Sequence, residues 1–224
     1  MKIRNILNII QEYGLLSCLK FLFSSTFFSN TYHSVIDRIL GLDFMDVVDA
    51  CDLKNSVPDS TAYYPSRRDV VRKIFRKYVN GEMQSFLDIG CGKGCVIASL
   101  ASLPFEKLDG LECSLGLSKI AKKNINRLGI THAKIYEIDA RYFDKYCDYT
   151  HIYLYNPFGP ETFQVVMNNI ESSLQQSLRK IYIVYANPIC HNIIIKNGLF
   201  KLIEIWPESV DYGNSIYIYS NDMS

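Results

Sequence analysis

The sequence lacks both an excess of charge of either sign and a long apolar run. Its 24 Lys and Arg residues nearly balance its 23 Asp and Glu residues, which leaves a net charge of +1. This balance does not favour a nucleic acid or an anionic membrane as partner, although a nucleic acid remains possible. The apolar segment at residues 14–28 contains Lys20 and is shorter than the about 20 apolar residues that cross a bilayer. We expect no transmembrane segment and, at most, peripheral membrane contact through residues 1–30.

The cysteines lack the spacing of a disulfide framework or a metal site. There are seven of them, scattered along the chain. An odd, scattered set suits a reducing cytoplasm, so we expect a cytoplasmic protein. Cys91 and Cys95 lie four residues apart, but no second Cys or His pair has ligand spacing. We therefore expect no bound metal.

Internal repeats are also absent, and from Phe86 onward predicted strands and helices alternate. This order predicts an α/β fold with a mostly parallel sheet and helices on both faces. We expect strands at residues 86–89, 107–111, 133–138, 151–155 and 181–185, and a last pair at residues 200–206 and 215–220. The short polar link at residues 211–214 predicts a C-terminal antiparallel hairpin. Ser114 is expected to begin a helix that Gly129 ends, and Pro160 suits the first turn of another.

The first part of the chain has a different pattern. We interpret residues 1–80 as an N-terminal helical cap and residues 81–224 as the main domain. Residues 43–65 carry two prolines and few periodic apolar residues, which predicts a loop. Ser66 is then expected to cap a helix with an apolar stripe on one side. The other side carries six basic residues, which predict either a solvated face or a surface that contacts phosphates: Arg67, Arg68, Arg72, Lys73, Arg76 and Lys77.

The most informative stretch is SFLDIGCGKG at residues 85–94. An apolar strand, a turn with Gly90, Gly92 and Gly94, and a helix follow one another, which is typical of a nucleotide-binding unit. Glycines let the backbone approach a ligand closely, and the N-terminus of the following helix offers free N–H groups.

Acids or amides stand at the ends of four successive predicted strands. These ends hold Asp88, Glu112, Asp139 and residues 156–159. Ligands of open α/β sheets bind at the carboxyl ends of the strands. Glu112 is placed to accept ribose hydroxyls, and Asp139 can accept an adenine amino group.

Two cofactors fit this frame, and the glycine turn separates them. A dinucleotide site needs G-x-G-x-x-G, but Cys95 stands at the third glycine position. An acid at the start of the turn, Asp88, suits a cofactor with a positively charged amino-acid tail. The turn therefore favours S-adenosylmethionine (SAM) over NAD.

The runs LDIGCGKG, GLEC, EIDA and YNPFG together resemble the class I SAM-dependent methyltransferases, in particular a bacterial subgroup with D-x-G-x-G-K-G and N-P-F motifs. The resemblance covers about residues 85–160 and implies a Rossmann-like, seven-stranded sheet. It also implies SAM as cofactor and S-adenosylhomocysteine as product. The residues that it implies for the methionine part are Asp88, Gly90, Cys91, Gly92 and Gly94. It implies Glu112 and Cys113 for the ribose and Asp139 and Ala140 for the adenine, with Asn156 beside them.

The segment Tyr155-Asn156-Pro157-Phe158 is similar to the N-P-P-[YF] motif of methyltransferases that act on planar nitrogens. The resemblance implies a catalytic role for Asn156, Pro157 and Phe158. This sequence has one proline where that motif has two, so a simple strand-to-helix turn is the alternative. His132 and His151 lie too far from the strand ends to act there. The resemblance also implies that Tyr64 folds over the site from the preceding segment.

We therefore predict a SAM-dependent methyltransferase that acts on a nitrogen or oxygen of a protein or small molecule. The alternatives are an RNA or DNA base N-methyltransferase, an NAD-dependent oxidoreductase and a non-catalytic cofactor-binding module.

Overall fold

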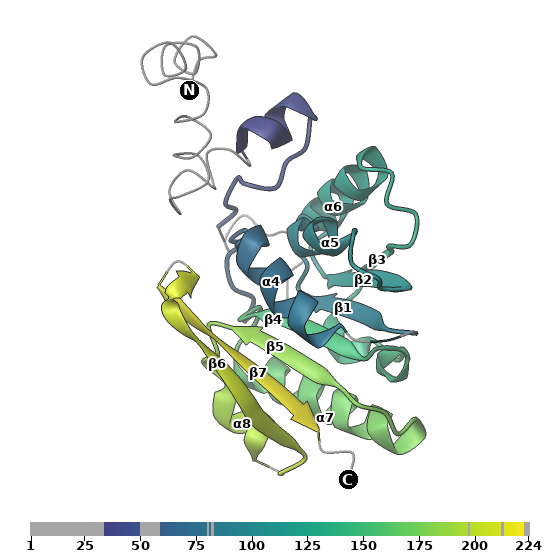
Figure 1. Cartoon of the computed structure of the whole chain (residues 1–224), viewed down its shortest axis with the longest axis vertical. Coiled ribbons are helices and arrows are strands. Elements are labelled where there is room, and N and C mark those ends of the chain that lie inside the picture. The colour runs from purple at the N-terminus through teal and green to yellow at the C-terminus, as the bar shows by residue number, and fades with distance from the viewer. Residues whose placement is uncertain are drawn as a thin grey trace. The chain divides into compact units, whose positions relative to one another are not determined.

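A computed structural model describes residues 34–49, 59–79, 81, 83–196, 198–211 and 213–221. The chain divides into two compact units, Met1–Phe44 and Met45–Ser224. The described part of the first unit contains a short helix at residues 34–39. The second unit contains the sheet with the helices that cover it (Figure 1).

The sheet has seven strands in the order β3-β2-β1-β4-β5-β7-β6. The first five strands along the chain are parallel to one another, and β7 is antiparallel to both of its neighbours. Their bounds are β1 (Ser85–Ile89), β2 (Lys107–Glu112), β3 (Ile135–Glu137), β4 (His151–Tyr155), β5 (Tyr182–Ala186), β6 (Phe200–Asp211) and β7 (Asn214–Asn221). The predicted mostly parallel sheet and its C-terminal antiparallel hairpin are confirmed, with Asp211 paired to Asn214 at the turn.

Five α-helices and two short 3₁₀ helices accompany these strands in the described residues of the second unit. They are α4 (Arg68–Tyr78), α5 (Cys95–Leu100), α6 (Leu115–Arg127), α7 (Pro160–Gln176), α8 (His191–Ile195), η2 (Ala140–Tyr142) and η3 (Tyr146–Asp148). Helix α6 begins as predicted, because the Leu117 amide donates to the Ser114 side chain. It ends before Gly129, whose φ of 65° a glycine adopts without strain. Pro160 opens α7.

The central strands alternate their side chains between two apolar cores. On β4, Ile152 and Leu154 face α7, and Tyr153 points to the opposite core. The α7 side contains Phe163, Val166, Met167 and Ile170, all fully buried. Helices α4, α5 and α6 cover the other face (Figure 1). The prediction of helices on both faces is confirmed.

Helix α4 belongs to the second unit, although we assigned residues 1–80 to a separate cap. Its predicted apolar stripe is buried in one core with residues of β1 and α5, because the stripe faces the sheet: Val70, Val71, Ile74, Phe75 and Tyr78. The second unit accordingly starts at Met45. Any further helix of the cap at residues 1–33 lies outside the described residues.

The predicted helix cap at Ser66 is wrong. Arg67 occupies the N-cap position and makes no side-chain capping bond. The Ser66 hydroxyl is buried and accepts a hydrogen bond from the Tyr153 hydroxyl at 2.9 Å. A tertiary contact with β4 has thus replaced the local one.

The basic side of α4 makes contacts within the chain. Arg72 donates to the hydroxyl of Ser102, and Lys77 forms a 2.6 Å ion pair with Glu204. The Lys73 ammonium lies 5.3 Å from the centre of the Trp206 ring. These contacts tie the helix to its neighbours.

His151 is structural, as its distance from the strand end predicts. It is 1% exposed and stacks on Tyr182 among aromatic rings. Burial lowers the pKa of His151 from 6.5 to about 4, so the ring is neutral at physiological pH.

In the part of the chain that the structure describes, no helix is both long and apolar enough to cross a membrane. The predicted membrane contact through residues 1–30 lies outside these residues.

Replacing Phe75 by alanine tests whether α4 is part of the domain core. Phe75 is fully buried and packs edge-on against Phe86 at a centroid distance of 5.1 Å. We expect Phe75→Ala to lower the free energy of unfolding by about 3–5 kcal/mol in urea denaturation. Arg76→Ala, on the exposed side of the same helix, is the control and should change it by less than about 0.5 kcal/mol. A loss below about 1 kcal/mol for Phe75→Ala would show that α4 is peripheral.

Candidate active site

The glycine turn brings the backbone into close contact with two other segments. Gly90, Gly92 and Gly94 have φ angles of 76°, 54° and 80°. A Cβ at Gly92 would lie 2.2 Å from ring atoms of Tyr63, and one at Gly90 would lie 2.6 Å from Cβ of Pro157. Neither position has room for a side chain, so both the space and the positive φ require glycine there.

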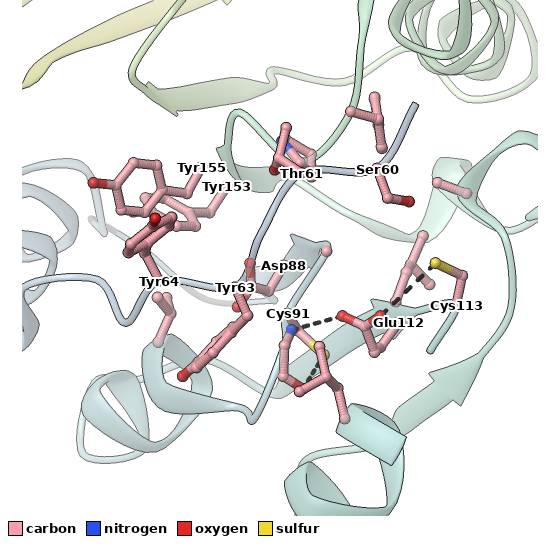
Figure 2. A pocket seen from close by; sticks show the side chains of 18 of the residues that line it. Ser60, Thr61, Tyr63, Tyr64, Asp88, Cys91, Glu112, Cys113, Tyr153 and Tyr155 are labelled. Atoms are coloured by element: carbon pink, nitrogen blue, oxygen red, sulfur yellow. Dashed lines mark hydrogen bonds between the residues drawn. The ribbon is translucent and has the colours of Figure 1, made fainter. Parts of the chain in front are cut away.

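A cavity of about 820 Å³, part of it open to solvent, lies at the carboxyl ends of β1, β2 and β4 and beside η2 (Figure 2). Ten residues predicted for the site line it: Asp88, Gly90, Cys91, Gly92, Glu112, Cys113, Asp139, Ala140, Pro157 and Phe158.

Two predicted residues are not among those that line this cavity. Gly94 precedes α5, and its carbonyl accepts the Ala98 amide at 3.0 Å. Asn156 lines an adjoining cavity instead, where Tyr185 donates a hydrogen bond to its Oδ1. Gly94 shapes the turn, and Asn156 lies on the side away from the predicted cofactor residues.

Asp88 is a buried carboxylate at the end of β1. It is 3% exposed and lines the cavity, and its carboxylate forms no hydrogen bond or ion pair with any described residue. Burial and the nearby charge of Glu112 raise its pKa well above the usual value. A carboxylate in such a position is stabilised by a ligand that brings a positive charge and N–H donors.

Glu112 connects the glycine turn to the start of α6. Its Oε2 accepts the Gly92 amide at 2.9 Å, and its Oε1 accepts the Ser114 amide at 2.8 Å. Burial raises its pKa, whereas these two bonds act in the opposite direction. The Cys113 thiol also donates to Oε1 at 3.8 Å, so it is Oε2 that keeps a lone pair to accept a hydroxyl group from a ligand.

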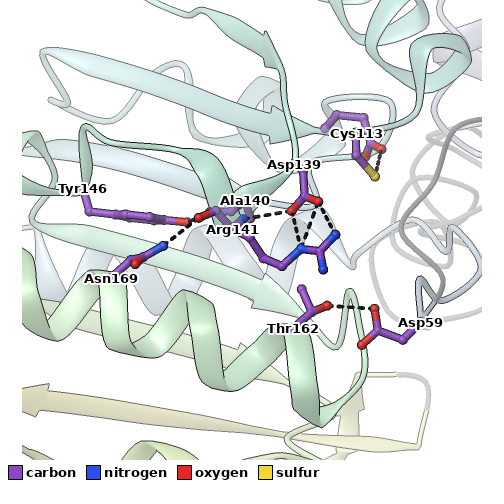
Figure 3. A network of polar contacts seen from close by, with 9 residues as sticks. Asp59, Cys113, Asp139, Ala140, Arg141, Tyr146, Thr162 and Asn169 are labelled. Atoms are coloured by element: carbon purple, nitrogen blue, oxygen red, sulfur yellow. Dashed lines mark hydrogen bonds and ion pairs between the residues drawn. The ribbon is translucent and has the colours of Figure 1, made fainter.

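Asp139 forms a local network with Arg141 (Figure 3). Its Oδ1 accepts the Arg141 amide at 2.9 Å, and the guanidinium donates to Oδ2 at 2.7 Å. Asn169 of α7 donates to the Arg141 carbonyl, and the Tyr146 hydroxyl donates to the carbonyl of Ala140. This network fixes the backbone of η2 at the wall of the cavity.

Residues 59–64, which we call the strap, cover the cavity, and they include Tyr64, which we predicted to fold over the site. The strap pairs with the turn after β4: the Thr61 amide donates to Pro157 O at 3.2 Å, and the Thr61 hydroxyl donates to Asn156 O at 2.8 Å. At its start, Asp59 accepts from the Thr162 hydroxyl at 2.9 Å (Figure 3). Further lining residues that sequence reasoning missed are Ser60, Thr61, Ala62, Tyr63, Ser66, Cys95, Val96, Leu111, Leu117, Ile138, Tyr153 and Tyr155.

Among the described residues, no group of three or more His, Cys, Asp or Glu side chains is arranged to hold a metal ion. Three thiols nevertheless line the cavity, those of Cys91, Cys95 and Cys113. Burial raises the pKa of the Cys91 thiol well above its usual value, so this thiol is protonated.

Comparison with known proteins identifies the fold. No protein-family profile matches the sequence, and no curated protein sequence matches it. Among solved structures, an RNA methyltransferase from Salinibacter ruber in complex with S-adenosyl-L-homocysteine aligns with a TM-score of 0.52 and 17% identity, over 71% of this chain and 95% of that one. A SAM-dependent methyltransferase from Aquifex aeolicus aligns with a TM-score of 0.53 and 12% identity, over 68% of this chain and 89% of that one. A ribosomal protein L11 methylase from Lactobacillus delbrueckii subsp. bulgaricus aligns with a TM-score of 0.52 and 12% identity, over 68% of this chain and 77% of that one.

These likenesses show the fold. The chain has the Rossmann-like, seven-stranded fold of class I SAM-dependent methyltransferases, as the resemblance of its motifs implies.

Neutralising Asp88 should stabilise the protein. Because the pKa of Asp88 is raised in the folded state, its charged form disfavours folding at neutral pH, and protonation relieves this as the pH falls. We expect Asp88→Asn to raise the free energy of unfolding by about 1 kcal/mol at pH 7. The difference from the parent protein should shrink as the pH falls toward 4.

Urea denaturation at a series of pH values measures this difference. Asp144→Asn, an exposed acid on the loop before η3, is the matched control and should have no such pH-dependent effect. A destabilised Asp88→Asn variant would mean that the carboxylate supports the fold.

Proposed function

We propose that this protein is a SAM-dependent methyltransferase. The observation that carries the proposal is the buried, unpaired carboxylate of Asp88 beside a glycine turn, with Glu112 at the end of the neighbouring strand. The fold and the likeness of solved methyltransferase structures support the same conclusion.

The residues of the cavity fit the three parts of SAM. Asp88 is suited to the ammonium of the methionine part, since it is buried and has no partner among the described residues. Glu112 keeps a lone pair on Oε2 for a ribose hydroxyl. For the adenine, Leu117, Ile138 and Ala140 supply apolar walls, and Asp139 supplies an acceptor.

When bound, SAM would supply a methyl group on a sulfonium. The acceptor's nitrogen or oxygen would bond to the methyl carbon as the S–C bond breaks, so that S-adenosylhomocysteine leaves and the acceptor releases a proton. This chain's own part is alignment and exclusion of water. The strap and Phe158 close over the cavity, and the strap is held by its bonds to residues 156–159.

The described residues that line the cavity include no histidine, and its three carboxylates have roles toward the cofactor. We therefore infer that the acceptor reacts without strong general-base assistance, which is easier for a nitrogen lone pair than for a hydroxyl. Asn156 and Pro157 stand at the edge from which an acceptor approaches, and we retain them with Phe158 as candidate catalytic residues.

A nucleic-acid acceptor is the second candidate. The RNA methyltransferase among the structural neighbours favours it. Arg72, Lys73 and Lys77 of α4 already contact side chains of this chain, which weakens the case for a phosphate-binding face. We also infer a reducing, cytoplasmic location, because the described cysteines are all free thiols.

Calorimetric titration with SAM, S-adenosylhomocysteine and NAD tests the cofactor. We expect the first two to bind and NAD not to bind. Asp88→Asn should weaken SAM binding at least about tenfold, since it loses a charge-assisted hydrogen bond. Asp144→Asn should bind SAM like the parent protein.

Binding of NAD alone would overturn the function and leave only the fold. Equal SAM affinity in Asp88→Asn and the parent would remove Asp88 from the cofactor site.

A further inference from the structure

A second cavity adjoins the first on the side of β5. It measures about 350 Å³ and is lined by Thr61, Ala62, Tyr64, Tyr155, Asn156 and Asn187. Four of these residues, Thr61, Ala62, Tyr64 and Tyr155, also line the first cavity. The two cavities are therefore neighbouring spaces.

The two asparagines of this cavity occupy equivalent positions on neighbouring strands. Tyr155 pairs with Ala186 at the ends of β4 and β5, and Asn156 and Asn187 follow directly. Each asparagine precedes a proline and has a positive φ, 40° and 50° respectively. Such a conformation is strained for most residues other than glycine, and it tends to occur at functional sites.

The backbone contacts that hold these positions leave polar side-chain atoms free. The Asn187 amide nitrogen donates to Ser215 O at 3.0 Å, and the Asn156 carbonyl accepts from the Thr61 hydroxyl. The side-chain amide of Asn187 makes no hydrogen bond to any described residue, and Tyr185 engages only Oδ1 of Asn156. The Nδ2 groups of both asparagines and the Oδ1 of Asn187 therefore remain available to a ligand.

The walls of the cavity are flat and uncharged. Tyr64 and Tyr155 supply aromatic rings (Figure 2). The ring of Tyr155 is held by a hydrogen bond from Asn214 to its hydroxyl at 3.2 Å, and Tyr64 is 57% exposed. None of the described lining residues carries a charge. An amidinium carries donors only, so it would leave the Nδ2 donors of the two asparagines without an acceptor, whereas a flat neutral amide offers both a donor and an acceptor and packs on the aromatic rings.

We propose that Asn187 determines acceptor specificity: with Asn156 it admits a flat, neutral group that carries both a donor and an acceptor, such as an amide, and it discriminates against a cationic group of the same shape. This proposal rests on the proposed function, because it makes the second cavity the acceptor site. Asn187 supplies hydrogen bonds from the strand next to that of Asn156.

Benzamide and benzamidinium are a matched pair of probes, since they have the same shape and differ in charge and in the carbonyl acceptor. Ligand-observed NMR titration at pH 7, with the first cavity saturated by S-adenosylhomocysteine, measures both dissociation constants. We expect benzamide to bind at least about tenfold more tightly than benzamidinium.

Asn187→Asp should reverse this preference, because it places a carboxylate at the cavity wall. Asn187→Gly should abolish the preference, and it keeps the fold because glycine accepts the positive φ. Asn168→Asp makes the same chemical change at an exposed position of α7 and should leave the preference as in the parent protein.

S-adenosylhomocysteine is titrated into the parent protein and each variant, and the probes are also titrated without it. If S-adenosylhomocysteine binds and the two probes bind equally, or neither binds, the role of Asn187 is overturned and the proposed function is not. If S-adenosylhomocysteine fails to bind but the probes are discriminated as expected, the cavity has this selectivity and the methyltransferase function fails.

Discussion

The two carboxylates of Asp88 and Glu112 lie buried at the ends of neighbouring parallel strands, and the site depends on this arrangement. Burial raises the pKa of both groups, and the charge of Glu112 raises that of Asp88 further, so the pair opposes folding unless donors compensate it. Glu112 receives two backbone donors, and these bonds fix the glycine turn against the start of α6. Asp88 receives none from the described residues, so its compensation is left to a ligand. One acid thus fixes the turn, and in the proposed function the other recognises the cofactor.

The rigidity of the turn extends from this pair. Asn124 of α6 donates to Lys93 O at 3.0 Å, which holds the end of the turn. The Gly90 and Cys91 amides both donate to Leu111 O at 2.9 Å, so β2 holds the start of the turn. With the turn fixed, the ring of Tyr63 can lie against Gly92 and bring the strap over the cavity. A site held in this way aligns reactants without reorganising, which is the main requirement of a methyl transfer.

The sequence predicted the features that local pattern controls. Strand and helix periodicity, the Ser114 cap and the three glycines were sufficient to predict the sheet and to bring ten of the predicted site residues to one cavity. The strap was not predictable in this way, because its place depends on contacts such as Thr61 with Asn156, which lie 95 residues apart. Ser66 shows the same limit: its type favours a helix cap, but its hydroxyl is engaged by Tyr153, 87 residues away. Local propensity yields to tertiary contacts at both positions.

The acceptor side follows a different physical principle from the cofactor side. Around Asp88 and Glu112, specificity comes from buried charge that needs a complementary ligand. Beside Asn156 and Asn187, it comes from neutral amides in strained conformations that Thr61 and Ser215 hold in place. A strained backbone persists only where its surroundings over-determine it, and here the strap provides part of that support. The same segment therefore lines both cavities, so in the proposed function one structural element encloses the cofactor and shapes the acceptor site.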